Sequence, residues 1–112
     1  MSDHMERLLY QDAQVLILAR REPQSVRLVG EIDITNSQAV DHALRCCWGG
    51  DAPLVVDTGA LTFVDLSGLR VLAMPALSPE CRWIRLVNLT PFQRRLLDLM
   101  GWRHEAPARP LA

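Results

Sequence analysis

The residues best suited to chemistry are Asp65-Leu66-Ser67-Gly68, which stand where a helical pattern begins. Asp65 is a natural N-cap, so Ser67 is predicted in the first helical turn, among unpaired backbone N–H groups at the positive end of the helix dipole. Gly68 is a poor helix former, by about 1 kcal/mol relative to alanine. A hydroxyl beside a residue without a side chain indicates a place where another molecule's backbone or a phosphate comes close. The alternative is that Asp65 only caps the helix and Gly68 only eases the turn into it.

A basic side chain follows on the same helical pattern. Arg70 comes three residues after Ser67, and residues at this spacing share one face of a helix. We expect Arg70 to contact either a phosphorylated Ser67 or a partner protein. A solvated arginine is the alternative.

Motifs that would make Ser67 a catalytic residue are missing from the sequence. A catalytic serine needs a nearby base, but the histidines all lie far from it along the chain: His4, His42 and His104. There is no GxSxG elbow, no P-loop and no GxGxxG. Asp33, Asp57 and Asp65 leave a metal-dependent phosphoryl acceptor as the rival enzyme. We expect a binding protein that is not an enzyme and needs no cofactor.

Composition argues against several other function classes. The 112 residues are 49% hydrophobic and 22% charged, an ordinary globular mix. A formal charge of −1 gives no sequence-wide basic field for nucleic acid or an anionic membrane. No apolar run approaches the roughly 20 residues that span a bilayer, and no signal-peptide core is present. Cys46, Cys47 and Cys81 form no CxxC and no Cys/His pair at ligand spacing, so we expect no metal and a reducing, cytoplasmic setting.

Strand-like and helical patterns alternate along the chain. The strand-like runs cover residues 14–19, 24–29, 54–57 and 83–87, with a short Gly-containing loop after Asp57. A first helix starts at Thr35, Asn36 or Ser37, stops at Gly49-Gly50, and buries one stripe: Val40, Ala43, Leu44, Cys47 and Trp48.

Two further helices follow. The middle helix begins near Leu66, is ended or kinked by Pro75, and buries Leu69, Leu72, Ala73 and Ala76. The last helix has Thr90 as N-cap, Pro91 at its first position and Gly101 at its end. Its predicted buried stripe consists of Phe92, Leu96, Leu99 and Met100.

These elements predict an α/β fold in a single domain over residues 12–103. Strands joined through helices should be parallel, so we expect a mostly parallel central sheet of four to five strands, with an antiparallel N-terminal strand and helices packed against it. Residues 1–11 form an N-terminal segment and residues 104–112 a loose C-terminal tail.

Three segments together resemble the STAS domain family: Gly30-Glu31-Ile32-Asp33, Val55-Val56-Asp57 and TFVDLSGL at residues 62–69. Their order and spacing match over about residues 12–103. This family takes in anti-sigma factor antagonists and a domain of sulfate transporters. Free-standing chains of this length resemble the anti-sigma factor antagonists (anti-anti-sigma factors) of bacteria.

The resemblance implies a binding switch centred on Ser67. In such antagonists the matching serine is phosphorylated by an anti-sigma factor that is itself an ATP-dependent serine kinase. The unphosphorylated form captures that kinase and frees a sigma factor, and a metal-dependent serine phosphatase restores it. The family fold would bring Asp33 near Ser67. The expected partner contacts are Asp33, Asp65, Leu66, Gly68 and Arg70.

The physical chemistry of Ser67 suits that role. A phosphate adds about −1.5 to −2 charges, and a helix N-terminus tolerates it, so the fold should survive. Like charge beside Asp65 and Asp33 would repel an acidic partner surface and break a packed interface.

One residue departs from the family pattern. Leu66 stands where many members have serine or another small polar residue, which removes an alternative acceptor and makes the site more apolar. Some STAS domains are never phosphorylated. The alternative function is therefore a non-phosphorylated scaffold, or an accessory subunit of an ABC-type lipid transporter or stress-sensing complex. Neither function implies nucleic acid or membrane contact, and a weak homodimer is left open.

Overall fold

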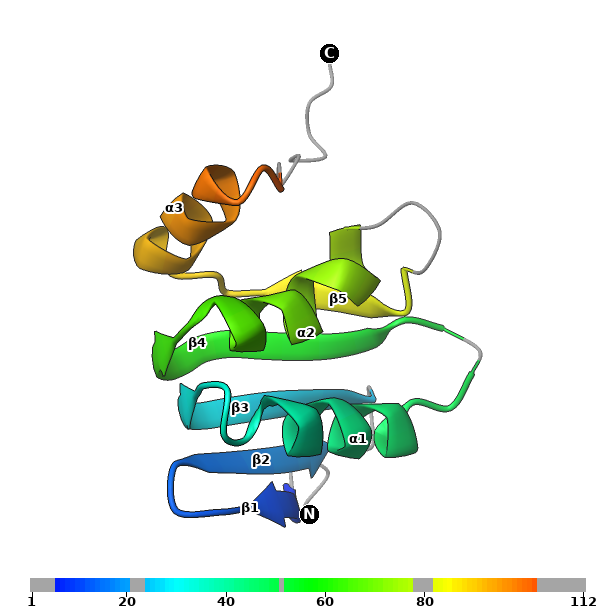
Figure 1. The fold of residues 1–112 in the computed structure, drawn as a ribbon. Helices are drawn as coiled ribbons and strands as arrows, with labels where there is room; N and C mark the ends of the chain where they lie inside the picture. The colour runs from blue at the N-terminus through cyan, green and yellow to red at the C-terminus, as the bar shows by residue number, and fades with distance from the viewer. Residues whose placement is uncertain (1–5, 21–23, 51, 78–81, 103–112) are drawn as a thin grey trace.

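The computed structural model describes residues 6–20, 24–50, 52–77 and 82–102. Five strands and three helices follow one another along the chain: β1 (Arg7–Gln11), β2 (Val15–Arg20), β3 (Ser25–Ile32), α1 (Ser37–Cys47), β4 (Leu54–Val64), α2 (Leu66–Leu77), β5 (Ile84–Val87) and α3 (Pro91–Leu99). The strands form one sheet in the order of the chain, as Figure 1 shows. β1, β2 and β3 pair antiparallel, whereas β3, β4 and β5 pair parallel.

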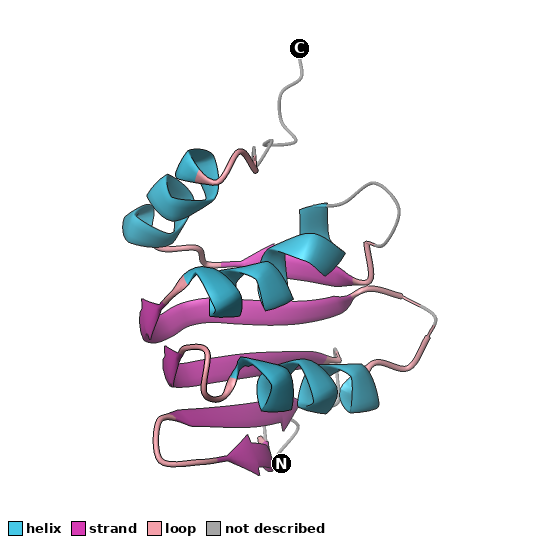
Figure 2. Ribbon diagram, viewed as in Figure 1, coloured by secondary structure: helices cyan, strands magenta, loops and turns pink. Residues whose placement is uncertain are grey.

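The predicted α/β class, with parallel central strands after an antiparallel N-terminal part, is confirmed. Helices α1 and α2 contact one another and lie across one face of the sheet (Figure 2). Alternate residues of the strands point into the core beneath them, as Val15, Ile17 and Ala19 do in β2. The parallel strands therefore end at one edge of the sheet, where each is followed by a loop or helix start.

Strand β1 lies within residues 1–11, which we set outside the domain. Its residues are exposed or half-buried and pair with β2 alone, with an irregularity between Leu8 and Tyr10. An edge strand with no fully buried position lacks the alternation by which a strand is recognised. The sheet thus begins at Arg7, and the tail predicted at residues 104–112 lies outside the described residues.

The loop predicted after Asp57 is wrong, because β4 continues without interruption to Val64. The register with β3 advances by an extra residue between Asp57 and Ala60, and again between Leu61 and Phe63. These β-bulges break the alternation of side chains, and Gly59 sits within the first of them. A glycine and a break in the alternation are also the features of a loop, so the sequence pattern does not distinguish this bulge from a loop.

Helix α2 runs to Leu77, so Pro75 does not end it. Leu69, Leu72 and Ala73 are buried as predicted, and Ala76 is half-buried. In α1, Asn36 occupies the N-cap position, and the helix stops just before Gly49-Gly50. Cys46 and Cys47 are both free thiols.

The predicted stripe of α3 is wrong in two places. Phe92 and Leu99 are exposed, whereas Gln93 and Leu97 are buried. The reason is a polar network that the periodicity does not reveal. Gln93 completes the capping box with Thr90, and its amide also donates to the backbone oxygen of Thr58 at 2.9 Å and accepts from the Thr58 hydroxyl at 2.8 Å. These bonds hold Gln93 inside, while Leu96 and Met100 of the predicted stripe still pack against the core.

Candidate functional site

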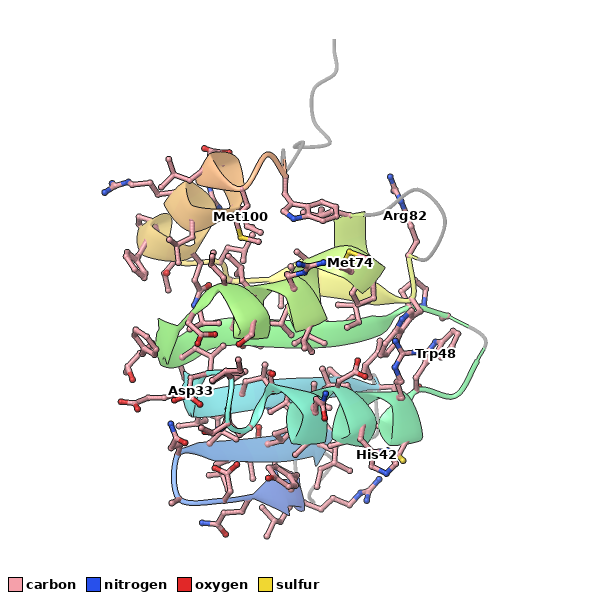
Figure 3. The ribbon with its side chains drawn as sticks, in the orientation of Figure 1. Asp33, His42, Trp48, Met74, Arg82 and Met100 are labelled. Carbon is pink, nitrogen blue, oxygen red and sulfur yellow. The ribbon has the colours of Figure 1, made fainter. Side chains whose placement is uncertain are left out.

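The carboxyl ends of β3 and β4 bring two predicted site residues to one edge of the sheet. Asp33 follows β3 directly, and Asp65 follows β4. The backbone N–H of Asp65 donates to the oxygen of Ile32 at 3.2 Å, which ties the two strand ends together. Figure 3 labels Asp33 at this edge, at the tip of β3. We refer to Asp33, Ile34, Asp65, Leu66 and Ser67 as the switch edge.

The Asp65 carboxylate is the centre of the switch edge. One oxygen accepts the Ser67 hydroxyl at 2.7 Å and the Gly68 N–H at 3.0 Å, and the other accepts the Ile34 N–H at 3.2 Å. Partial burial raises the pKa of Asp65, but the hydrogen bonds from Ser67 and from backbone N–H groups outweigh it and lower the pKa below its ordinary value. Asp65 is therefore ionised at neutral pH.

Ser67 lies in the first turn of α2, as predicted, with Asp65 as the cap. Its side chain is half-buried, and its hydroxyl donates to Asp65. A hydroxyl whose proton is directed at an ionised carboxylate keeps its oxygen lone pairs free to attack an activated phosphate supplied by another protein. The geometry therefore leaves the Ser67 oxygen available for reaction with an electrophile.

Gly68 has a structural reason to be glycine. It is buried, and a Cβ at this position would lie 2.7 Å from Ile32 Cγ2 and 2.8 Å from Val64 Cγ2. The close approach that we predicted for another molecule is therefore made by the protein's own strands. Gly68 lets α2 start directly against β3 and β4, and this places Ser67 beside Asp65.

Asp33 belongs to the same edge but does not bond to Ser67. Its carboxylate accepts from the hydroxyl and N–H of Thr35 and from the Gln14 side chain at 2.9 Å. Hydrogen bonds from Thr35, and then from Gln14, hold the pKa of Asp33 below its ordinary value. The link from Asp33 to Ser67 instead passes through Ile34, whose N–H is bound by Asp65.

Two residues of the switch edge carry exposed apolar side chains. Leu66 is 58% exposed and Ile34 is 75% exposed. Phe63, near the end of β4, is also exposed. Sequence reasoning found Leu66 but missed Ile34 and Phe63. Ile34 is an apolar residue between the polar residues Asp33 and Thr35. That isolated position in a polar stretch is the sequence feature that could have indicated an exposed contact residue.

Arg70 is exposed on α2, one turn beyond Ser67. Within the described ranges it forms no hydrogen bond or ion pair with another side chain. Its predicted contact with a phosphate or a partner stays a prediction.

Of the three acids named for the rival enzyme, Asp57 lies apart from Asp33 and Asp65. Asp57 lies eight residues before Asp65 on β4, where it bonds to Asn88 and Gly59. His42 lies on α1, well away from Asp33 (Figure 3), and faces Cys46 at 3.6 Å. His42 and Cys46 are four residues apart on a helix, a spacing that allows two side chains to bind one metal ion, so the prediction that the sequence holds no Cys/His pair at ligand spacing is wrong. Among the residues that the structure describes, no three potential metal ligands gather.

No helix in the described part of the chain has both the length and the apolar character needed to cross a bilayer.

Comparison with known families identifies the domain. The model of a protein family described as "Mlab, STAS domain" matches residues 17–110, a range that contains the whole switch edge. No curated protein matches the chain.

Proposed function

The chain belongs to the STAS domain family, and from that premise we propose that it is an anti-sigma factor antagonist. In this proposal the unphosphorylated protein binds an anti-sigma factor with serine kinase activity in the cytoplasm and so releases a sigma factor. The kinase phosphorylates Ser67, which ends binding, and a metal-dependent serine phosphatase reverses the modification. The protein acts by binding, with no catalysis of its own and no cofactor.

One observation carries the proposal: the Ser67 hydroxyl is half-buried in the first turn of α2, 2.7 Å from an ionised carboxylate. A serine with only a capping role would accept a backbone N–H; here Asp65 does that, and Ser67 donates to it. The serine is therefore not needed to close the helix start. The exposed side chains of Leu66 and Ile34 at the same edge support a role for Ser67 in a contact surface.

The surface around Ser67 suits a partner protein. Leu66 and Ile34 present apolar area that is exposed in the isolated chain, while Asp33 and Asp65 carry charge beside it. A phosphate among buried apolar side chains would be costly because its charge loses water. Phosphorylation would therefore remove affinity at this surface without refolding the domain.

Incubation with the kinase tests the proposal. The protein is incubated with labelled ATP and, in turn, each anti-sigma factor of its genome that carries a serine kinase domain, followed by phosphopeptide mapping. We expect label on the peptide containing Ser67, no label on Ser67→Ala, and full label on Thr62→Ala. Thr62 is the matched control because it is an exposed hydroxyl just before the same edge. Label on an aspartate, or on no residue, would contradict the proposal.

A second function is supported by the apolar character of the switch edge and by the family description, which names Mlab and no sigma-factor regulator. In it the chain is a non-phosphorylated scaffold, or an accessory subunit of an ABC-type lipid transporter or stress-sensing complex, bound through Leu66 and Ile34. Stable co-purification with an ABC-type ATPase, equally by the native protein and by Ser67→Glu, would favour this function over the switch.

A further inference from the structure

We propose that Asp65 is a positioning residue that couples Ser67 to Ile34, so that a phosphate on Ser67 frees Ile34 from its fixed place at the switch edge. The inference rests on the proposed function in one respect, that Ser67 is the modified residue. It adds a route by which the modification reaches a second part of the contact surface, 33 residues away along the chain.

The coupling follows from how the carboxylate is shared. Asp65 Oδ1 accepts from the Ser67 hydroxyl and the Gly68 N–H, while Oδ2 accepts from the Ile34 N–H. Both oxygens belong to one planar group, so a displacement that separates Oδ1 from Ser67 also moves Oδ2. Ile34 is therefore held in place by a group whose position depends on Ser67.

Phosphorylation removes the bond that Ser67 makes. The Ser67 oxygen forms a bond to the γ-phosphorus of ATP as the bond from that phosphorus to the β–γ bridging oxygen breaks. ADP leaves, and the hydroxyl proton passes to the Asp65 carboxylate, to which it is directed, and from there to solvent water. Ser67 then has no hydrogen to donate, and a phosphate carrying about −1.5 to −2 charges stands beside the Asp65 carboxylate. Like charges at this separation repel, so the carboxylate turns away.

The helix start survives this movement, but the bond to Ile34 does not. The phosphate can accept from backbone N–H groups of the first turn, such as that of Gly68, because a helix N-terminus binds phosphate well. Within the loop between β3 and α1, the N–H groups of Asp33, Thr35 and Asn36 bond to acceptors in the loop itself. The N–H of Ile34 alone among these four bonds outside the loop, to Asp65.

The release is local, because other bonds still hold the loop. The Gln14 side chain donates to Asp33 at 2.9 Å, and the Asn36 side chain donates to the oxygen of Glu31 at 3.1 Å. The apolar side chain of Ile34, 75% exposed, thus loses its fixed position while the rest of the loop stays in place. A partner that needs Ile34 and Leu66 together would meet a disordered contact as well as a phosphate.

The test measures the Ile34 amide in the free protein. Phosphoserine is placed at position 67 during translation, without any kinase, and amide hydrogen exchange is followed by NMR. We expect exchange of the Ile34 N–H to rise about tenfold, the factor that corresponds to one net hydrogen bond. The Thr35 N–H, which Asp33 holds, serves as the internal reference and should not change.

Two variants separate coupling from general loosening. In Asp65→Asn the side chain is neutral, so phosphoserine at 67 should change Ile34 exchange by less than twofold relative to the unmodified variant. In Asp33→Asn the Asp65 carboxylate, which bonds to Ser67 and Ile34, is unchanged. Phosphoserine at 67 should therefore still raise the exchange rate of the Ile34 N–H about tenfold.

Unchanged Ile34 exchange in the phosphoserine protein would overturn the coupling. A rise of equal size in Thr35 would overturn it too, because the whole loop would then have loosened. Neither result would touch the proposed function, which depends on modification by a kinase and on partner binding.

Discussion

The hydroxyl of Ser67 donates to the Asp65 carboxylate at 2.7 Å, and the same carboxylate caps the helix that carries Ser67. A residue that could have been a simple cap therefore also orients the hydroxyl that we propose as the phosphorylation site. This double role makes the Asp65 carboxylate important for stability and for the proposed switch, and the two can be measured separately.

Asp65→Asn should destabilise the protein by roughly 0.3–1 kcal/mol at neutral pH, because asparagine still caps a helix but lacks the negative charge that favours a helix N-terminus. The pKa of Asp65 is lowered in the fold, so its contribution is present above the unfolded pKa and is lost as pH falls through the folded value. The difference between native and variant should therefore shrink below about pH 4. Urea unfolding at pH 7 and pH 3 measures the free energy of unfolding of both proteins. A larger difference between them at pH 3 than at pH 7 would contradict the prediction.

Gly68→Ala should destabilise the protein by roughly 1–3 kcal/mol, although alanine is the better helix former. The added Cβ would lie under 3 Å from Ile32 and Val64, at 2.7 and 2.8 Å. The matched control is Gly49→Ala, whose Cβ would meet its nearest neighbour, the Gln24 side chain, at 3.6 Å. The control should change stability by less than about 0.5 kcal/mol. Equal urea midpoints for Gly68→Ala and the native protein would show that the packing at Gly68 is not needed.

Gln93→Leu should cost roughly 2–4 kcal/mol, despite placing an apolar residue in a buried position. The variant leaves the Thr58 hydroxyl and backbone oxygen without the partners they have at 2.8 and 2.9 Å, and it removes half of the capping box. Adding Thr58→Val should recover part of the loss, because the buried hydroxyl is then gone. If the double variant loses more stability than the two single variants lose together, the hydrogen bonds between Gln93 and Thr58 are not what holds Gln93 inside.

Leu66→Ser should weaken binding of the kinase anti-sigma factor by about tenfold or more, since a leucine buried in an interface contributes about 1.5–3 kcal/mol. Stability should hardly change, because Leu66 is 58% exposed in the free chain. Leu99→Ser is the control: this leucine is 77% exposed at the end of α3, outside the switch edge. Titration calorimetry compares the three proteins. If the Leu99 variant loses as much affinity as the Leu66 variant, the contact surface has been misplaced.

Local signals in the sequence were enough to predict some of the site. The position of Ser67 in a first turn depends on Asp65 and the helical pattern beside it, and Thr90 with Pro91 marked the start of α3 in the same way. These features need only neighbouring residues. The α/β order and the parallel strands followed from the alternation of patterns along the chain.

What the sequence did not reveal depends on residues far apart in the chain. The role of Ile34 comes from a bond to Asp65, and the need for Gly68 comes from contact with Ile32. The two bulges of β4 depend on its register with β3, and the inward turn of Gln93 depends on Thr58. Periodicity has no access to such pairings, so it gave a loop and a wrong stripe in these places.

The central claim is that a phosphate on Ser67 switches partner binding off. Its most direct test is the affinity of each kinase anti-sigma factor of the same genome for the unmodified protein and for the protein with phosphoserine at 67, measured by titration calorimetry. We predict that one of these factors binds the unmodified protein and binds the phosphoserine form at least about a hundredfold more weakly, a loss of roughly 2.7 kcal/mol. Equal affinity for the two forms would contradict it.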